Sequence, residues 1–435
     1  MDDSTQIPQS INVHDLGDLL RTQLSADDLD GLTQIITSSR RPAGVQGSES
    51  GAEEPDYDSI LAQVLPRIAD QRARFERERQ ELPSLFRELL EHPPDRRVVL
   101  VSNSSRFRSL SLCDLLLEKS LDACHRDTLE AIELAELAVQ MSRALSGLDH
   151  GYAILNDLRA RAMCYLANAY RVARRLQDAE LAFAEADELL LEGTGDLMEL
   201  ARLRGMQGNL SGDRRRFEEC FELYDRAMAI YRRCGESHLL GRTMIKKANF
   251  LGYAFRSEEA IEMLREGLSL VDAQREPRLV LAANHNLVLN LNESGRPEEA
   301  EELLEACRPL YKQYGERIHR LRLRWLEANL AREKGDLHTA EQAYRRTREA
   351  LLQEGLGWDV ALVSLELASI YAQQGRIAEI KNLAEELVPV FRASDLRREA
   401  VAALILFQKA AQMEKISLGL IRSTVRQLRS LRQDR

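Results

Sequence analysis

Small apolar residues recur along the chain at intervals of about forty positions, each with similar neighbours. A larger side chain follows four residues later and, in most units, a small one three residues after that, so these side chains share one face of a helix. A second recurring position, which is also mostly small, lies twelve residues before each of the small apolar residues described first. The later positions are Ala179, Cys220, Ala260, Ala300, Ala340 and Ile380, and the earlier ones are Ala167, Gly208, Ala248, Val288, Ala328 and Ala368. The pattern predicts repeated pairs of helices that cross closely.

Glycines mark the turns inside three of these units. Gly295, Gly335 and Gly375 fall where the chain leaves one helix and needs a residue that tolerates a positive φ. A looser unit around Ala131 lies 48 residues before Ala179. We therefore expect about seven units, and strand patterns are nearly absent. The predicted fold class is all-α, a solenoid in which each helix pair packs on its neighbours.

These spacings resemble the tetratricopeptide repeat (TPR), whose signature has small residues at positions 8, 20 and 27 and large or aromatic ones at 11 and 24. Tyr170 and Tyr371 match position 11, and Ala340, Tyr344 and Thr347 match positions 20, 24 and 27. The resemblance covers roughly two thirds of the chain and implies a right-handed superhelix of antiparallel helix pairs. Repeats of about forty residues are typical of bacterial TPR regulators and peptide sensors.

Composition divides the chain further. We expect a short acidic helical head (1–36), a Gly/Ser/Glu-rich flexible linker (37–56), N-terminal capping helices (57–108), the repeat array (109–395) and C-terminal capping helices (396–435). In the last helix Ile421, Val425 and Leu428 form an apolar stripe beside several arginines. The sequence favours a solvated cap, which solenoid ends require, over a contact with nucleic acid or an acidic partner.

The charge, the cysteines and the apolar stretches of the sequence argue against a disulfide-bonded, metal-binding or membrane-spanning protein. The formal net charge is −10, and residues 1–58 hold nearly all of it, with twelve acids and three arginines. The six cysteines form no CxxC pair and are interpreted as buried thiols, without disulfide or metal roles. The first residues lack the basic start and apolar core that a leader sequence has, and no stretch approaches the ~18 apolar residues of a membrane span. We expect a cytoplasmic protein without a metal or cofactor.

The layout of head, linker and array also resembles bacterial TPR proteins with an anti-sigma-factor-like head. That resemblance implies a zinc site made by a histidine and a Cys pair. Here the residues after the second predicted helix run from Thr37 to Arg41, and no cysteine precedes Cys113. The zinc ligands are absent, so a transcription-related regulator with a degenerate head is the alternative interpretation.

The first helices of four units carry an arginine and an asparagine seven residues apart, at positions 2 and 9 of the repeat register. In TPR arrays these positions face the concave groove, and seven residues are about two helical turns. Related polar or aromatic side chains lie nearby in the fifth and sixth units. These ladder residues are Arg161, Asn168, Arg202, Asn209, Arg242, Asn249, His285, Asn286, Arg322, Trp325 and Asn329.

Two interpretations of the ladder residues stay open. Asparagine can pair with the backbone of an extended peptide and arginine can grip a carboxylate, so the ladder predicts a groove for a peptide or acidic tail. Alternatively, the same groups hydrogen-bond between adjacent helices and hold the superhelix together. A further hypothesis is autoinhibition, in which the acidic head occupies the arginine-bearing groove through its flexible linker.

Catalytic motifs are missing from the sequence. The eight histidines are scattered, and there is no HExxH, phosphate loop or nucleophile elbow. We expect no catalytic residues and a non-enzymatic scaffold or adaptor in bacterial signalling or regulation. Its partner is expected to be a protein or peptide, with no membrane contact and no nucleic acid, and the sequence leaves the oligomeric state open.

Overall fold

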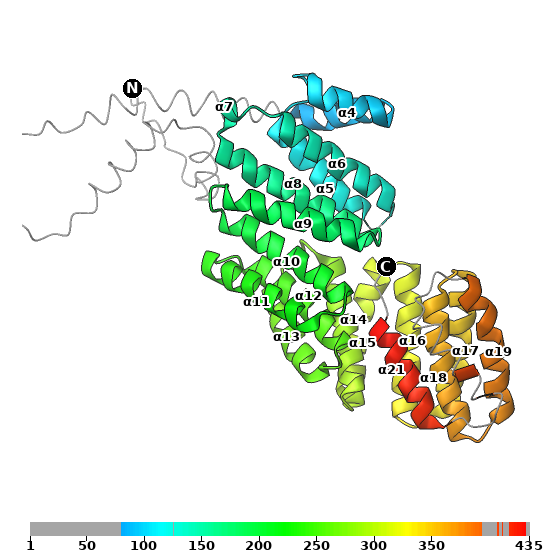
Figure 1. Ribbon diagram of the computed structural model, residues 1–435. Helices are drawn as coiled ribbons and strands as arrows, with labels where there is room; N and C mark the ends of the chain where they lie inside the picture. The colour runs from blue at the N-terminus through cyan, green and yellow to red at the C-terminus, as the bar shows by residue number, and fades with distance from the viewer. Residues whose placement is uncertain (1–79, 125, 394–406, 409–410, 412–416, 432–435) are drawn as a thin grey trace, which may run out of the picture. The chain divides into compact units, whose positions relative to one another are not determined.

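The computed structural model describes residues 80–124, 126–393, 407–408, 411 and 417–431. Within these ranges the chain is built from α-helices joined by short turns, and no strand occurs (Figure 1). The all-α repeat fold predicted from the sequence is confirmed. The head and the linker, residues 57–79 of the N-terminal cap, and most of 394–416 lie outside the described residues, as does any contact of the acidic head.

The helices follow one another in pairs. Those before residue 204 are α4 (Pro94–Asn103), α5 (Leu110–Ala123), α6 (Thr128–Ala144), α7 (Gly147–His150), α8 (Tyr152–Val172) and α9 (Leu176–Leu191). Those that follow are α10 (Leu197–Asp213), α11 (Phe217–Cys234), α12 (Ser237–Tyr253), α13 (Ser257–Leu270), α14 (Pro277–Glu293), α15 (Pro297–Tyr314), α16 (Arg317–Glu333), α17 (Leu337–Gln353), α18 (Gly357–Gln373), α19 (Ile377–Ala393) and α21 (Leu418–Leu431). Residues 80–90 are also helical.

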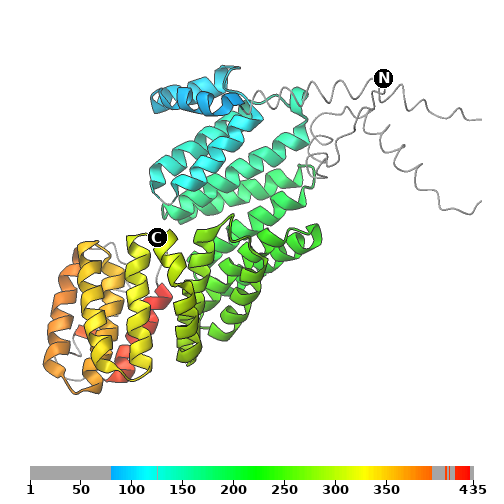
Figure 2. The same ribbon diagram turned by 180° about the vertical axis from the view of Figure 1, so that it is seen from behind.

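The chain forms two compact units, Met1–Leu203 and Arg204–Arg435, and the division falls within α10. In the first unit α5 packs on α6, α6 on α8 and α8 on α9, while α4 packs on α6. In the second unit each helix from α11 to α19 packs on the next. Figure 2 shows α16 to α19, coloured from yellow to orange, side by side as seen from behind. The first helices α12, α14 and α16 of successive pairs also touch, which is the contact pattern of stacked repeats.

The predicted small positions are the closest points of helix packing. The six positions from Ala179 to Ile380 that recur about every forty residues are fully buried. Of the positions twelve residues before them, Ala167, Ala248, Val288, Ala328 and Ala368 are fully buried as well. At Gly208 an added Cβ would lie 3.2 Å from the Tyr224 ring, so a larger residue would press on that aromatic side chain. The turn glycines Gly295, Gly335 and Gly375 have φ of 73°, 84° and 70°, as predicted.

The cysteines are buried with one exception. Cys113, Cys124, Cys164, Cys220 and Cys307 are buried, and burial raises the pKa of each of these thiols. The prediction was wrong for Cys234, which is exposed. It is the last residue of α11, directly before the left-handed Gly235, so no following turn covers it.

A glycine pair brings α12 and α13 together. A Cβ on Gly241 would lie 2.6 Å from the Gly267 carbonyl oxygen, and one on Gly267 would lie 2.9 Å from the Gly241 oxygen. We expect Gly241→Ala to lower the free energy of unfolding by about 1–3 kcal/mol, because backbone must move to admit the methyl group.

The matched control is Gly205→Ala in α10, where no atom lies within 4 Å of an added Cβ. It should raise stability by about 0.5–1 kcal/mol through helix propensity. Urea unfolding followed by circular dichroism compares the two, and equal effects of the same sign would contradict the close approach at Gly241.

Candidate functional site

The C-terminal helix α21 has one buried and one exposed side. It begins after Ser417, whose Oγ accepts a hydrogen bond of 3.2 Å from the backbone N–H of Leu420. Ile421, Thr424 and Leu428 are buried at the spacing of one helix face. Arg422 is exposed on the other side, and Arg426 is exposed with its guanidinium 6.0 Å from the centre of the Phe255 ring. The helix therefore packs through one face, and that face meets α18 (Figure 1).

The helix beneath α21 is covered on all sides. Every residue from Val360 to Tyr371 of α18 is buried, and α18 packs against α17, α19 and α21. At the ladder positions of this repeat the chain carries Leu362, Leu365 and Ser369 in place of arginine and asparagine. Because α17 and α19 belong to the stack of repeats, we infer that α21 covers the side of α18 that carries the ladder positions.

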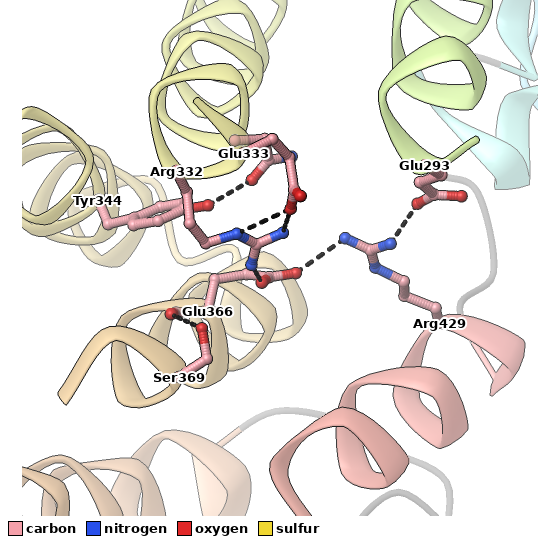
Figure 3. Close-up of polar contacts among 8 residues, drawn as sticks. Glu293, Arg332, Glu333, Tyr344, Glu366, Ser369 and Arg429 are labelled. Atoms are coloured by element: carbon pink, nitrogen blue, oxygen red, sulfur yellow. Dashed lines mark hydrogen bonds and ion pairs between the residues drawn. The ribbon is translucent and has the colours of Figure 1, made fainter. Parts of the chain in front are cut away.

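Four helices contribute to a charge cluster around Glu366, whose side chain is only 5% exposed. Its Oε1 accepts a 2.8 Å hydrogen bond from Arg429 of α21, and its Oε2 pairs with Arg332 of α16. Arg429 also pairs with Glu293, the last residue of α14, while Arg332 contacts Glu333 at 2.7 Å. Figure 3 shows Glu366 and Glu293 facing Arg429 from two sides.

The two carboxyl groups of this cluster differ in acidity. Burial acts to raise the pKa of Glu366, but Arg332 and Arg429 together outweigh it and hold that pKa below its usual value. Burial raises the pKa of Glu293, and the negative charge of Glu366 adds to that effect while Arg429 opposes it. Glu366 is therefore the more acidic of the two groups, and it is the one that contacts both guanidinium groups.

Two ladder asparagines accept hydrogen bonds from the second helix of their own repeat. The Tyr344 hydroxyl donates to Asn329 Oδ1 over 2.7 Å, and the Tyr224 hydroxyl donates to Asn209 Oδ1 over 2.6 Å. Each tyrosine lies at position 24 and is fully buried. The hydroxyl satisfies an amide oxygen that would otherwise be desolvated without a partner.

The other ladder residues of the second unit have varied surroundings. Arg242 lies 3.3 Å from Glu276, and Asn249 Oδ1 accepts a 3.2 Å hydrogen bond from Asn286. His285 Nδ1 lies 2.7 Å from the Tyr311 hydroxyl. Trp325 is buried in the hydrophobic cluster that also contains Ile421 and Leu428 of α21.

Arg322 differs from these residues. Its Nε is buried and has no hydrogen-bond partner among the described residues. The side chain as a whole is half-buried, at the ladder position one turn before Trp325. A guanidinium N–H without an acceptor is a candidate for a contact with an anionic group.

The ladder residues of the first unit have polar partners within that unit. Arg161 of α8 contacts Glu199 at 2.6 Å and Asp114 of α5 at 2.7 Å. Arg202 lies 3.2 Å from the same Glu199. Asn168 is buried, and its Oδ1 accepts a hydrogen bond from Arg171. The structure therefore gives each of these side chains a partner within the unit.

Sequence reasoning missed the cluster of Glu293, Arg332, Glu366 and Arg429. One signal was present, because Glu366 is the one acid between Val360 and Tyr371 in an otherwise apolar stretch. A carboxylate in such a stretch needs a cationic partner. The identity of that partner depends on α21, which lies 63 residues further along the chain at Arg429.

The described residues contain neither a cluster of metal ligands nor a membrane-spanning helix. No three His, Cys, Asp or Glu side chains gather there as metal ligands would. No helix in that part of the chain has both the length and the apolar character of a membrane span.

Comparison with solved structures identifies the fold. Aspartyl phosphate phosphatase F from Bacillus subtilis is similar over 90% of this chain and 96% of its own, with a TM-score of 0.52 and 14% sequence identity. The TPR-like repeats described for a kinesin light chain of Podosopora anserina cover 47% of this chain and 98% of theirs, with a TM-score of 0.34 and 20% identity. No protein-family profile and no curated protein matches the sequence. The chain thus has a TPR-type solenoid fold.

Proposed function

We propose that this protein is a non-enzymatic scaffold that binds a partner protein or peptide through the ladder positions of its second unit. The preferred ligand is an extended segment or tail that carries a carboxylate. The observation that carries the proposal is Arg322, whose buried Nε has no acceptor among the described residues. The side chain as a whole is half-buried, so a ligand carboxylate could bind its guanidinium through two hydrogen bonds, one of them from Nε once the side chain turns to expose that atom.

A second ladder arginine supports the same kind of ligand. Arg242 lies at the equivalent position two repeats earlier, and its side chain is 35% exposed beside Glu276. Partly exposed ion pairs contribute little to stability, because both charges remain hydrated. A ligand carboxylate could therefore replace Glu276 at small cost. Regulation in bacterial signalling, which the repeat length suggests, belongs to this proposal, as does the cytoplasmic location.

The phosphatase name belongs to the Bacillus subtilis protein. At 14% identity the likeness extends to the fold. The proposal of a non-enzymatic role rests on the scattered histidines and on the lack of catalytic motifs in the sequence.

Fluorescence anisotropy with a set of extended peptides ending in Asp or Glu tests this function. We expect Arg322→Ala to weaken binding at least tenfold, about 1.4 kcal/mol, because the charge-assisted hydrogen bonds are lost. Arg324→Ala is the matched control, since this arginine is exposed on the same helix. Equal binding by both folded variants, or equal binding of peptides without the acidic residue, would contradict the proposal.

A further inference from the structure

We propose that α21 is a displaceable internal ligand, and that the surface it covers binds an arginine-bearing amphipathic helix of a partner. This surface, the α21 seat, consists of α18 with Glu293 of α14 and Arg332 of α16. The inference rests on the proposed binding function and names a second ligand class for it. A partner helix with the same chemistry would replace α21 and occupy its seat.

The α21 helix has few anchors. Its buried side chains are Ile421, Thr424 and Leu428, and Thr424 satisfies its own hydroxyl by donating to the Leu420 carbonyl oxygen over 2.9 Å. The helix is 14 residues long, and helices of that length are marginal in water without tertiary contacts. Its hold on the seat therefore depends on these aliphatic side chains with the half-buried Val425, on Arg429, and on Arg426, whose guanidinium lies over the Phe255 ring.

Part of the α21 seat is held by a contact that does not involve α21. Glu366 uses its two oxygens separately, with Oε2 held by Arg332 from within the repeats and Oε1 held by Arg429 of α21. Departure of α21 frees Oε1, while Oε2 keeps its contact with Arg332. Glu293, at the end of α14, loses its partner at the same time. Once α21 has left, Glu366 and Glu293 would both lack the guanidinium group that Arg429 supplied to them.

The geometry also defines the ligand. Arg429 uses Nη1 for Glu293 and Nη2 for Glu366, so one planar guanidinium bridges two acids. A lysine ammonium is a single compact charge and cannot reproduce this fork. Ile421 and Leu428 are seven residues apart and fill the apolar part of the seat. The expected ligand is a helix with aliphatic side chains two turns apart and an arginine directly after the second.

A labelled peptide of residues 417–431 tests displacement by fluorescence anisotropy with full-length proteins. Arg429→Glu places a negative charge against Glu293 and Glu366 and should release α21 from the seat. We expect this variant to bind the peptide at least tenfold more tightly than the wild type. Arg422→Glu makes the same charge change on the exposed side of α21 and should behave as the wild type. A peptide carrying Arg429→Lys should bind more weakly to the released seat.

Several results would overturn the inference. Equal peptide binding by the wild type, Arg429→Glu and Arg422→Glu would show that the seat is not an exchangeable site. Loss of amide protection throughout α14, α16 and α18 in Arg429→Glu would make α21 an integral part of the fold. A wild-type dimer that Arg429→Glu dissociates would assign the seat to a second copy of the chain.

The same preparations separate this inference from the proposed function. If Arg429→Glu still binds the acidic peptides through Arg322 but ignores the 417–431 peptide, the displaceable ligand is refuted and the scaffold function stands. If the 417–431 peptide binds while acidic peptides do not, the Arg322 contact fails and the α21 seat stands.

Discussion

Replacing Glu366 by alanine is expected to lower the free energy of unfolding of the second unit by about 3–5 kcal/mol. Glu366 is the buried carboxylate that Arg332 and Arg429 share, so its removal leaves two guanidinium groups close together without their common anion. Urea unfolding followed by circular dichroism measures the loss. Hydrogen exchange should place the weakened amides in α16, α18 and α21.

Glu333→Ala is the matched control for this change. Glu333 also pairs with Arg332, but its side chain is 41% exposed, and such pairs are worth less than about 1 kcal/mol. A similar loss for both variants would contradict the central role of Glu366.

The contribution of Glu366 should also depend on pH. Its pKa is lowered in the folded chain, because the two arginines outweigh the opposing effect of burial. A lowered pKa gives stability that is fully present above the unfolded value of about 4.5 and is lost as the pH falls through the folded pKa. The difference between wild type and Glu366→Ala should be constant from pH 6 to 8 and shrink below about pH 4.5.

Tyr344→Ala should cost about 3–5 kcal/mol, as large-to-small changes of buried aromatic residues do. Its ring is fully buried in the same hydrophobic cluster as Trp325, and its hydroxyl holds Asn329. Tyr344→Phe keeps the ring but leaves Asn329 Oδ1 without this donor, so we expect a smaller loss of about 1–3 kcal/mol. Thermal and urea unfolding of both variants measure these costs.

A double-mutant cycle with Asn329→Ala shows what the ladder asparagine does. If the hydrogen bond to Tyr344 is its role, Asn329→Ala and Tyr344→Phe should lower stability by non-additive amounts. If Asn329→Ala leaves stability unchanged but weakens peptide binding, the ligand contact predicted from the sequence is favoured. Tyr224→Phe, which affects the equivalent pair with Asn209, serves as the independent repeat of the experiment.

Much of the fold was predictable because it is local and periodic. Each unit buries a small residue at the same position of its second helix, as Ala260, Ala300 and Ala340 do. The same packing requirement therefore recurs about every forty residues and is visible in the sequence. Turn glycines such as Gly335 follow from the same logic, since a positive φ is readily adopted only by glycine. The exposed Cys234 was not predicted, because its exposure depends on the end of one helix and not on the repeat pattern.

The candidate site was predictable only in part. The sequence singled out the ladder residues, but it could not reveal that Asn329 and Asn209 accept from tyrosines of their own repeats, because either partner choice fits the spacing. Arg322 has the same spacing as Arg161, yet Arg161 has two acidic partners while the Nε of Arg322 has none among the described residues. Spacing fixes the face of a helix and leaves the partners of each side chain undetermined.

The helix pairs, their period and the faces that they bury follow from the order of residues along the chain, because local backbone geometry and hydrophobic spacing are properties of contiguous residues. The packing of α21 on α18 and the contacts of Arg429 with Glu366 and Glu293 became known from the folded structure alone. These contacts join residues 63 and 136 positions apart, and no periodicity links them. Such long-range charge pairing depends on how the stacked helices place their side chains in space, which one-dimensional spacing does not encode.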